Sequence, residues 1–277
     1  MILIADSGSS KTDWAIIEDQ KITRITGQGM NPYFMSEADL HAILQNDLSG
    51  FNQCTFNAIH FFGAGCTPGV MSLKIKTVVE SYFQCSNIQV ESDIVGAAKA
   101  LIQNQEGLIL ILGTGMNSGW FNGQKIVNQV PSLGYLLGDE ASGANIGKSL
   151  LTAYLRSELP TDLHVIMQQF LKTESVPEII TQLYQHPYPN RWLASIAALF
   201  KDCNNHPYLS TLVRQSFDLL CQRVLSKYDP KNTVVNATGS IAYYYQTELK
   251  AALEMHGRSL GVVIQKPIEG LINYYAH

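Results

Sequence analysis

Short apolar runs separated by polar turns occupy the first hundred residues. Residues 2–5 form an apolar run that ends in the polar stretch 6–10, and further runs follow at residues 14–18 and 21–26. This order predicts three antiparallel strands, the last two joined by a turn at Asp19-Gln20. Ser36 and Asp39 then form a capping-box pattern at the start of a helix. A strand at 58–64, a helix after Pro68, a strand at 88–91 and a helix at 94–103 follow.

The same order occurs a second time. An apolar run at 108–112 ends in the glycine-rich stretch 113–119, and a strand at 120–121, a turn at 122–123 and a strand at 125–130 follow. Residues 18–22 read EDQKI, and residues 122–126 read NGQKI. We therefore expect two duplicated lobes that face each other, an N-terminal lobe at 1–104 and a C-terminal lobe at 105–277.

A long helical insertion, from about residue 139 to 228, distinguishes the second lobe. Its pattern is interrupted by four prolines, at positions 160, 177, 187 and 189. A strand at 233–237, a turn at 238–240, a helix to about Met255 and a strand at 260–265 follow. The last helix begins at Pro267, and it can pack back on the first lobe.

The charge and the cysteines narrow the range of partners and compartments. The 277 residues carry a net charge of -4 with a pI near 6.0, and lysine and arginine do not cluster. No nucleic acid or anionic membrane is therefore expected as a partner. The five cysteines are far apart, form no CxxC pair and are odd in number, which indicates thiols in a reducing compartment. The first apolar run of about five residues is too short for a signal peptide or a membrane span. We expect a cytoplasmic protein.

Two glycine-rich hairpin turns are the strongest candidates for chemistry. In residues 6–13, small residues let backbone N–H groups converge on an anion, and Asp6 could hold a hydrated magnesium ion. Residues 113–119 form a similar turn at the equivalent point of the second half. Two such turns facing across a cleft could position a triphosphate for phosphoryl transfer. Neither turn is a P-loop or a dinucleotide-binding fingerprint, and each alone could be an ordinary polar turn.

Together these segments resemble a known family. The two hairpins, the segment ending at Asp93, the sequence LGDE at 137–140 and the sequence ATGS at 237–240 are similar to the phosphate-1, connect, phosphate-2 and adenosine motifs of actin-like kinases. The nearest match is the BadF/BadG/BcrA/BcrD ATPase family, which contains the N-acetylglucosamine kinases. The likeness covers nearly the whole chain in order. It implies an α/β fold of two ribonuclease-H-like lobes with a central cleft that closes over ATP and a sugar.

The resemblance also implies roles for individual residues. Asp93 matches the catalytic base, and Asp6 matches the magnesium-binding position. The positions implied for the nucleotide are Gly8, Ser9, Lys11, Thr12, Thr114, Gly115, Gly239 and Ser240. The positions implied for the sugar are Asn31, Asn117, Ser132, Leu133, Gly134 and Asp139.

Each of three implied residues also has a structural interpretation. Asp93, between a strand and a helix, could be an N-cap, and Asn31 before Pro32 is an ordinary turn signal. Asp139 with Glu140 could be acids in the first turn of a helix.

The chain departs from the family in two of the implied positions. The first hairpin has serines where many members have glycines, and Leu133-Gly134-Tyr135 stands where an N-acetylglucosamine kinase has a tryptophan between glycines. Serine hydroxyls can still donate to phosphate, but the second departure leaves the identity of the sugar open.

The resemblance implies ATP-dependent phosphorylation of an amino sugar, namely the conversion of N-acetylglucosamine to its 6-phosphate. The implied cofactors are ATP and Mg²⁺, and the implied partners include a second copy of the chain in a homodimer. Two alternatives stay open. An activator ATPase of a dehydratase or reductase would need an iron–sulfur cluster between two subunits, for which Cys66 is the candidate ligand. A nucleotide- or sugar-binding protein without catalysis could be built on the same lobes.

Overall fold

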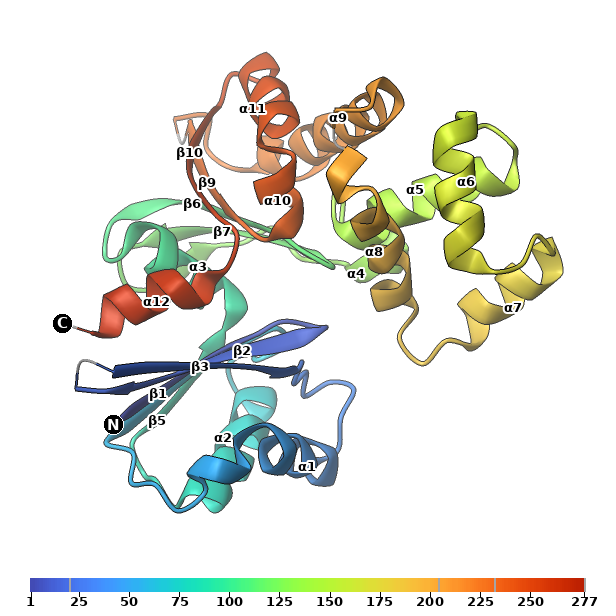
Figure 1. Ribbon diagram of the computed structural model, residues 1–277. Coiled ribbons are helices and arrows are strands. Elements are labelled where there is room, and N and C mark those ends of the chain that lie inside the picture. Colours follow the sequence, from blue (N-terminus) through green and yellow to red (C-terminus); the bar gives the residue numbers. More distant parts are fainter. Residues whose placement is uncertain (20, 204, 232, 277) are drawn as a thin grey trace. The chain divides into compact units, whose positions relative to one another are not determined.

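The computed structural model describes residues 1–19, 21–203, 205–231 and 233–276, and the chain divides into two compact units (Figure 1). Unit 1 comprises residues 1–109, 121–127 and 266–277, and unit 2 comprises residues 110–120 and 128–265. Among the described residues, no helix combines the length and the apolar character that crossing a membrane requires.

Unit 1 contains a five-stranded sheet with the order β3-β2-β1-β4-β5. The first three strands are antiparallel neighbours, whereas β1, β4 and β5 are parallel. The strands are β1 (Ile2–Ser7), β2 (Lys11–Glu18), β3 (Lys21–Gln28), β4 (Ala58–Gly63) and β5 (Ile88–Ser92).

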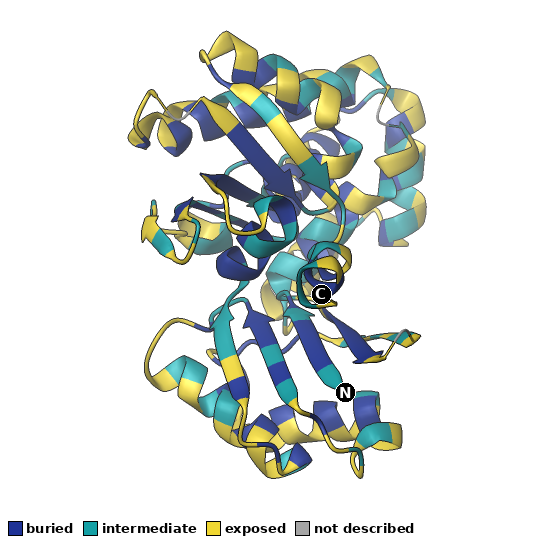
Figure 2. Ribbon diagram, turned by 90° about the vertical axis from the view of Figure 1, so that its left-hand side faces the viewer, coloured by how far each residue is buried: buried dark blue, intermediate teal, exposed yellow. Residues whose placement is uncertain are grey.

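Helices cover both faces of this sheet because alternate side chains of a strand point to opposite faces. Leu3 packs with the buried residues of α1 and α2, while Ile4 packs with those of α3 and α12. Figure 2 shows buried residues along the strands. The last helix therefore belongs to the core of unit 1. The helices are α1 (Glu37–Leu48), a 3₁₀ turn (Ser49–Phe51), α2 (Val70–Phe83), α3 (Asp93–Ile102) and α12 (Pro267–Tyr275).

The second sheet repeats the topology of the first. Its order is β10-β9-β6-β7-β8, which is the order of the first sheet read from the other edge. β6 to β10 therefore correspond to β1 to β5 in turn. β9 and β10 are parallel, as β4 and β5 are. The predicted duplication of the fold is thus confirmed. The strands are β6 (Glu106–Leu112), β7 (Met116–Asn122), β8 (Ile126–Asn128), β9 (Val234–Thr238) and β10 (Ser259–Ile264).

The predicted helical insertion is present in unit 2, and several of its helices begin at prolines. Pro160 precedes α6, whereas Pro177, Pro189 and Pro207 lie in the first turns of α7, α8 and α9. A proline is tolerated there because the first N–H groups of a helix lack intrahelical partners. The helices of unit 2 are α4 (Gly134–Leu137), α5 (Gly143–Leu155), α6 (Thr161–Leu171), α7 (Val176–Gln185), α8 (Pro189–Leu199), α9 (Pro207–Arg223), α10 (Ser240–Tyr244) and α11 (Gln246–Met255), with 3₁₀ turns at Lys201–Cys203 and Leu225–Lys227.

The structure differs from the sequence-based expectation in local details. The first hairpin is longer than predicted, because β1 extends to Ser7 and β2 starts at Lys11. The helix predicted up to Met255 is two helices, since the buried Tyr245 has a non-helical backbone. The predicted turn at Asp19-Gln20 includes residue 20, which lies outside the described residues.

Candidate active site

The turn of the first hairpin is short and closely packed. The Gly8 N–H donates to the carbonyl oxygen of Lys11 at 2.9 Å, and the Gly29 N–H donates to that of Ser10 at 3.3 Å. A Cβ atom on Gly29 would lie 2.5 Å from the Gly8 carbonyl oxygen, so only glycine fits there. Gly8 and Ser9 are partly exposed, although the Gly8 N–H is bonded within the turn.

The structure places Thr12 inside the hairpin. Its side chain is fully buried, and its hydroxyl donates to the Gln28 carbonyl oxygen at 2.9 Å and lies 2.9 Å from the Ser7 hydroxyl. The Ser7 hydroxyl in turn accepts from the Met30 N–H at 3.0 Å. These bonds connect both strands of the hairpin to the segment that follows β3. The Thr12 hydroxyl thus fixes the shape of the turn.

Two carboxyl groups of unit 1, those of Asp13 and Asp93, act on a third, that of Asp6, near the carboxyl end of β1. Asp6 and Asp13 are directly opposite on β1 and β2, which puts their side chains on the same face of the sheet. Burial, followed by the charges of Asp13 and Asp93, raises the pKa of Asp6 from 3.8 to about 7, and Lys11 opposes this rise.

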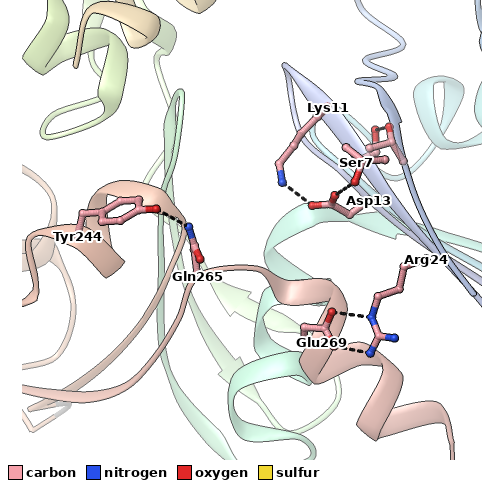
Figure 3. Close-up of polar contacts among 9 residues, drawn as sticks. Ser7, Lys11, Asp13, Arg24, Tyr244, Gln265 and Glu269 are labelled. Carbon is pink, nitrogen blue, oxygen red and sulfur yellow. Dashed lines mark hydrogen bonds and ion pairs between the residues drawn. The ribbon is translucent and has the colours of Figure 1, made fainter. Parts of the chain in front are cut away.

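Asp13 has partners that Asp6 does not share. Its carboxylate accepts from the Lys11 ammonium group at 2.5 Å and from the Thr26 hydroxyl at 2.7 Å, and the first of these contacts is drawn in Figure 3. Burial alone would raise the pKa of Asp13, but these two hydrogen bonds outweigh it and lower the pKa. The positive charge of Lys11 is therefore directed mainly at Asp13.

The surroundings of Asp6 fit a divalent cation. Magnesium is commonly held by one or two carboxylates together with waters and substrate phosphates. Burial, and after it the charges of Asp13 and Asp93, raise the pKa of Asp6, and a cation bound beside the carboxyl group would favour its ionised form. Among the described residues, no group of three or more histidine, cysteine, aspartate or glutamate side chains forms an all-protein metal site.

Asp93 is the first residue of α3, and Ser92 is the N-cap. The Asp93 carboxylate accepts from the Ile94 N–H at 2.8 Å, so it stabilises the start of the helix without being its N-cap. Its charge also raises the pKa of Asp6 and, after burial, that of Cys66. Asp93, Asp6 and Cys66 therefore lie near one another.

Asn31 forms the predicted turn and also contacts the loop after β4. Its side-chain oxygen accepts from the Tyr33 N–H at 3.0 Å. Gly65 has a φ of +79°, and a Cβ atom there would lie 2.6 Å from the same oxygen. Cys66, whose pKa is raised by burial and then by the charge of Asp93, directly follows Gly65 in this loop. The loop therefore links Asn31 to the surroundings of Asp93. Asn31 is 8% exposed.

In unit 2, the start of α5 supports the second hairpin. The Gly143 and Ala144 N–H groups donate to the carbonyl oxygens of Gly113 and Thr114 at 2.7 and 3.1 Å. These donors have no partner within the helix, so the hairpin satisfies them. Thr114 and Gly115 are left partly exposed.

The turn after β9 lies against this hairpin. Gly239 has a φ of +105°, and a Cβ atom on it would lie 2.3 Å from the Leu112 carbonyl oxygen. Glycine is therefore required both by the backbone conformation and by the space. Ser240, the first residue of α10, is exposed. The two segments assigned to the nucleotide in unit 2 are thus in contact.

Asp139 lies before α5 rather than in its first turn. The N-cap of α5 is Ser142, and Asp139 has a φ of +57°, so the interpretation as a first-turn acid is wrong. This left-handed conformation is uncommon for a residue other than glycine and is often found at functional sites. Asp139 is 7% exposed, and burial raises its pKa.

Asp139 connects the second hairpin to the segment before α4. Its carboxylate accepts from the Ser132 hydroxyl at 3.2 Å and from the backbone of Met116. A Cβ atom on Gly115 would lie 3.0 Å from the same carboxylate. Asn117, on β7, accepts from the Gln129 amide at 2.8 Å. The Asp139 carboxylate thus lies beside Gly115 and Ser132, and Asn117 is connected through Gln129 to the segment that precedes Ser132.

Leu133 and Gly134 lie at the start of α4. Leu133 is 58% exposed, and Gly134 has a φ of +70° that favours glycine. Leu136 and Leu137 on the same short helix are also exposed. The segment thus presents an apolar surface beside Ser132.

Sequence reasoning missed several residues that shape the site. Asp13 was treated only as part of a polar turn, although it is buried and paired with Lys11. Gly29, which packs on the first hairpin, and Tyr228, which bonds to the second, were not identified. The Gly-Gln-Gly sequence at 27–29 was a signal for close backbone approach, whereas nothing local marked Tyr228.

Known proteins share this architecture. A Porphyromonas gingivalis protein provisionally named an N-acetylglucosamine kinase is 35% identical, with a TM-score of 0.92 over 100% of this chain and 99% of that one. An N-acetylmuramic acid/N-acetylglucosamine kinase of Clostridium acetobutylicum is 26% identical over 157 residues, which cover 55% of this chain and 48% of that protein. The match thus spans about half the length of this curated relative.

A ROK family glucokinase from Streptomyces griseus, solved with glucose and AMPPNP, has a TM-score of 0.60 at 13% identity, over 98% of this chain and 97% of that one. This likeness concerns the fold alone. No protein-family model matches the chain. The full-length match at 35% identity, together with the duplicated sheets, places the chain in the N-acetylglucosamine kinase-like family.

Proposed function

We propose that the chain transfers the γ-phosphoryl group of ATP to the 6-hydroxyl group of N-acetylglucosamine. The observation that carries the proposal is the presence of two equivalent hairpin turns on duplicated sheets, with carboxyl groups beside each. Phosphoryl transfer requires positioning and charge stabilisation, which such turns supply. Membership of the family supports the choice of an amino sugar.

The nucleotide is assigned to three turns. In unit 1, the partly exposed residues Gly8 and Ser9 and the Lys11 ammonium group would contact the phosphates. In unit 2, Thr114 and Gly115 would contact them. Gly239 and Ser240 would lie beside adenosine. The role of Thr12 as a phosphate ligand stays a prediction, since its hydroxyl is bonded within the hairpin.

Asp6 would hold Mg²⁺, which supplies charge neutralisation at the phosphates when bound. Asp13 would act indirectly, because it pairs with the Lys11 ammonium group, whose charge only partly offsets the raised pKa of Asp6.

Asp93 would act as the general base. Its carboxylate would take the proton of the 6-hydroxyl group while the sugar oxygen bonds to the γ-phosphorus and the bond to the β–γ bridging oxygen breaks, which releases ADP. The bond from the Ile94 N–H holds the side chain in one orientation at the start of α3.

The sugar is assigned to polar groups that are fixed by their neighbours. Asn31, Asn117, Ser132 and Asp139 would bind ring hydroxyl groups, and Leu133 with Gly134 would lie against an apolar part of the sugar. A carboxylate and amides that are held in place discriminate strongly against analogues that lack a hydroxyl group. The buried position of Asp139 is suited to this task.

The activator alternative lacks support from the placement of Cys66. This thiol is 1% exposed, and burial raises its pKa to about 12. A cluster ligand must be a thiolate at the surface shared by two subunits. All five cysteines are free, which agrees with a proposed location in the cytoplasm.

A panel of acceptors tests the proposal. ADP release should be measured with Mg-ATP and N-acetylglucosamine, glucosamine, N-acetylmannosamine, N-acetylmuramic acid or glucose, and calorimetry should record Mg-ATP binding with each. We expect the highest kcat/KM with N-acetylglucosamine. ADP release without dependence on any sugar would reject the kinase, and a preference for another acceptor would reject the assigned substrate.

A further inference from the structure

Tyr228 bridges two segments of unit 2 that are distant from it in sequence. It follows the 3₁₀ turn after α9 and is 2% exposed. Its phenolic oxygen accepts from the Val130 N–H at 3.0 Å and lies 2.9 Å from the Ser118 hydroxyl. One side chain therefore connects β7 to the segment after β8.

These two segments carry residues assigned to the sugar. Ser118 directly follows Asn117, and Val130 lies two positions before Ser132. The Gln129 amide donates to Asn117 at 2.8 Å, which is a second bridge between the same segments. Gln129 is exposed, whereas the Tyr228 bridge is buried. Water can replace the Gln129 bond but has little access to the bonds of Tyr228.

Tyr228 is itself held in place. The guanidinium group of Arg258 donates to the carbonyl oxygens of Leu225 and Tyr228 at 2.7 and 3.2 Å. Arg258 is 9% exposed, so these bonds are shielded from water. The backbone of Tyr228 is thus held by Arg258, and its phenolic oxygen is bonded to Ser118 and Val130. These bonds restrict the separation of residues 117–118 from residues 130–132.

We propose that Tyr228 is a positioning residue for sugar binding, which sets the distance between Asn117 and Ser132. The inference rests on the proposed function, and it assigns to the end of the helical insertion a role in recognising the acceptor. Tyr228 is buried and does not touch the sugar. Its effect therefore appears in the fit of the sugar and not in the binding of ATP, because small displacements of positioning groups weaken substrate binding and turnover strongly.

The test compares Tyr228→Phe with Tyr154→Phe. Both changes remove one hydroxyl group from a buried tyrosine of unit 2, and Tyr154 lies at the end of α5, far along the helix from Asp139. We expect Tyr228→Phe to raise the KM for N-acetylglucosamine about tenfold and to leave the KM for ATP within about twofold. Tyr154→Phe should leave both constants unchanged. Hydrogen exchange should be faster at residues 117–118 and 130–132 in Tyr228→Phe alone.

The possible outcomes separate the role of Tyr228 from the proposed function. An active wild-type enzyme with an unchanged sugar KM in Tyr228→Phe would overturn the role of Tyr228 and leave the proposed function standing. Equal losses for ATP and sugar would assign Tyr228 a general structural role and also overturn the inference. A wild-type protein that phosphorylates no sugar would overturn both. Should Tyr228→Phe fail to fold, Ser118→Ala removes one of the two bonds with the tyrosine ring in place, and the same shift of the sugar KM, smaller in size, is expected.

Discussion

Replacing Asp6 with asparagine should stabilise the folded chain at neutral and alkaline pH. Asp6 is partly buried, and burial of its carboxyl group, followed by the charges of Asp13 and Asp93, raises the pKa from 3.8 to about 7. A carboxyl group with a higher pKa in the folded state favours folding only while it is protonated. Its contribution is therefore fully present below about pH 4 and is lost as the pH rises through about 7.

The size of the effect follows from the two pKa values. A shift of about three units at about 1.4 kcal/mol per unit amounts to about 4 kcal/mol above pH 7. Asparagine has nearly the same size and carries no charge, so it avoids this loss. The difference in the free energy of unfolding between Asp6→Asn and the wild type should grow by about 2 to 3 kcal/mol between pH 5 and pH 8.

Urea unfolding at a series of pH values measures this difference. Asp202→Asn, which removes an exposed carboxyl group, is the matched control and should show no such trend. Because Asp6 is assigned to Mg²⁺, the more stable Asp6→Asn variant should also lose the tightening of ATP binding by magnesium. A stability difference that does not change with pH would refute the reasoning, since it would mean that Asp6 is not buried against Asp13 and Asp93.

Three further substitutions test separate parts of the site. Asp93→Asn should lower kcat about 10²- to 10⁴-fold while the protein stays folded, measured by steady-state kinetics and thermal melting; near-normal turnover would exclude Asp93 as the base. Gly29→Ala puts a methyl group 2.5 Å from the Gly8 carbonyl oxygen and should raise the KM for ATP at least about tenfold, whereas Gly50→Ala, with no atom within 4 Å of its Cβ, should not. Asp139→Asn should raise the KM for N-acetylglucosamine about 10- to 100-fold with ATP binding retained in calorimetry, and unchanged sugar kinetics would remove Asp139 from the sugar site.

The arrangement of the strands could be predicted from the sequence because it depends on local patterns. Short apolar runs between polar turns gave nearly every strand, and the second occurrence of the same order predicted the second sheet. The prolines of the insertion were predicted as interruptions of the helical pattern, and two of them, Pro177 and Pro189, lie in the first turns of α7 and α8, where proline is tolerated. Boundaries were less accurate where polar residues such as Ser7 and Thr12 lie within strands and bond to each other.

The parts of the site that could not be predicted depend on contacts between distant residues. Asp139 with Glu140 looks like a helix start in sequence, and only the fold shows the left-handed backbone at Asp139. Tyr228 bonds to Ser118, which is 110 positions away, and no pattern near either residue indicates the pair. Asp13 is an ordinary polar residue in the sequence, and its burial between β1 and β3 depends on the pairing of β2 with both of these strands.

Identification of the reaction product tests the central claim most directly. The protein should be incubated with Mg-ATP and N-acetylglucosamine, and the product characterised by phosphorus and proton NMR and by mass spectrometry, with Asp93→Asn as the parallel sample. We predict one equivalent of N-acetylglucosamine 6-phosphate for each ADP formed, with the phosphorus coupled to the two protons on C6, and little product from Asp93→Asn. A phosphate on another carbon, or the absence of a phosphorylated sugar while ATP is bound, would contradict the account.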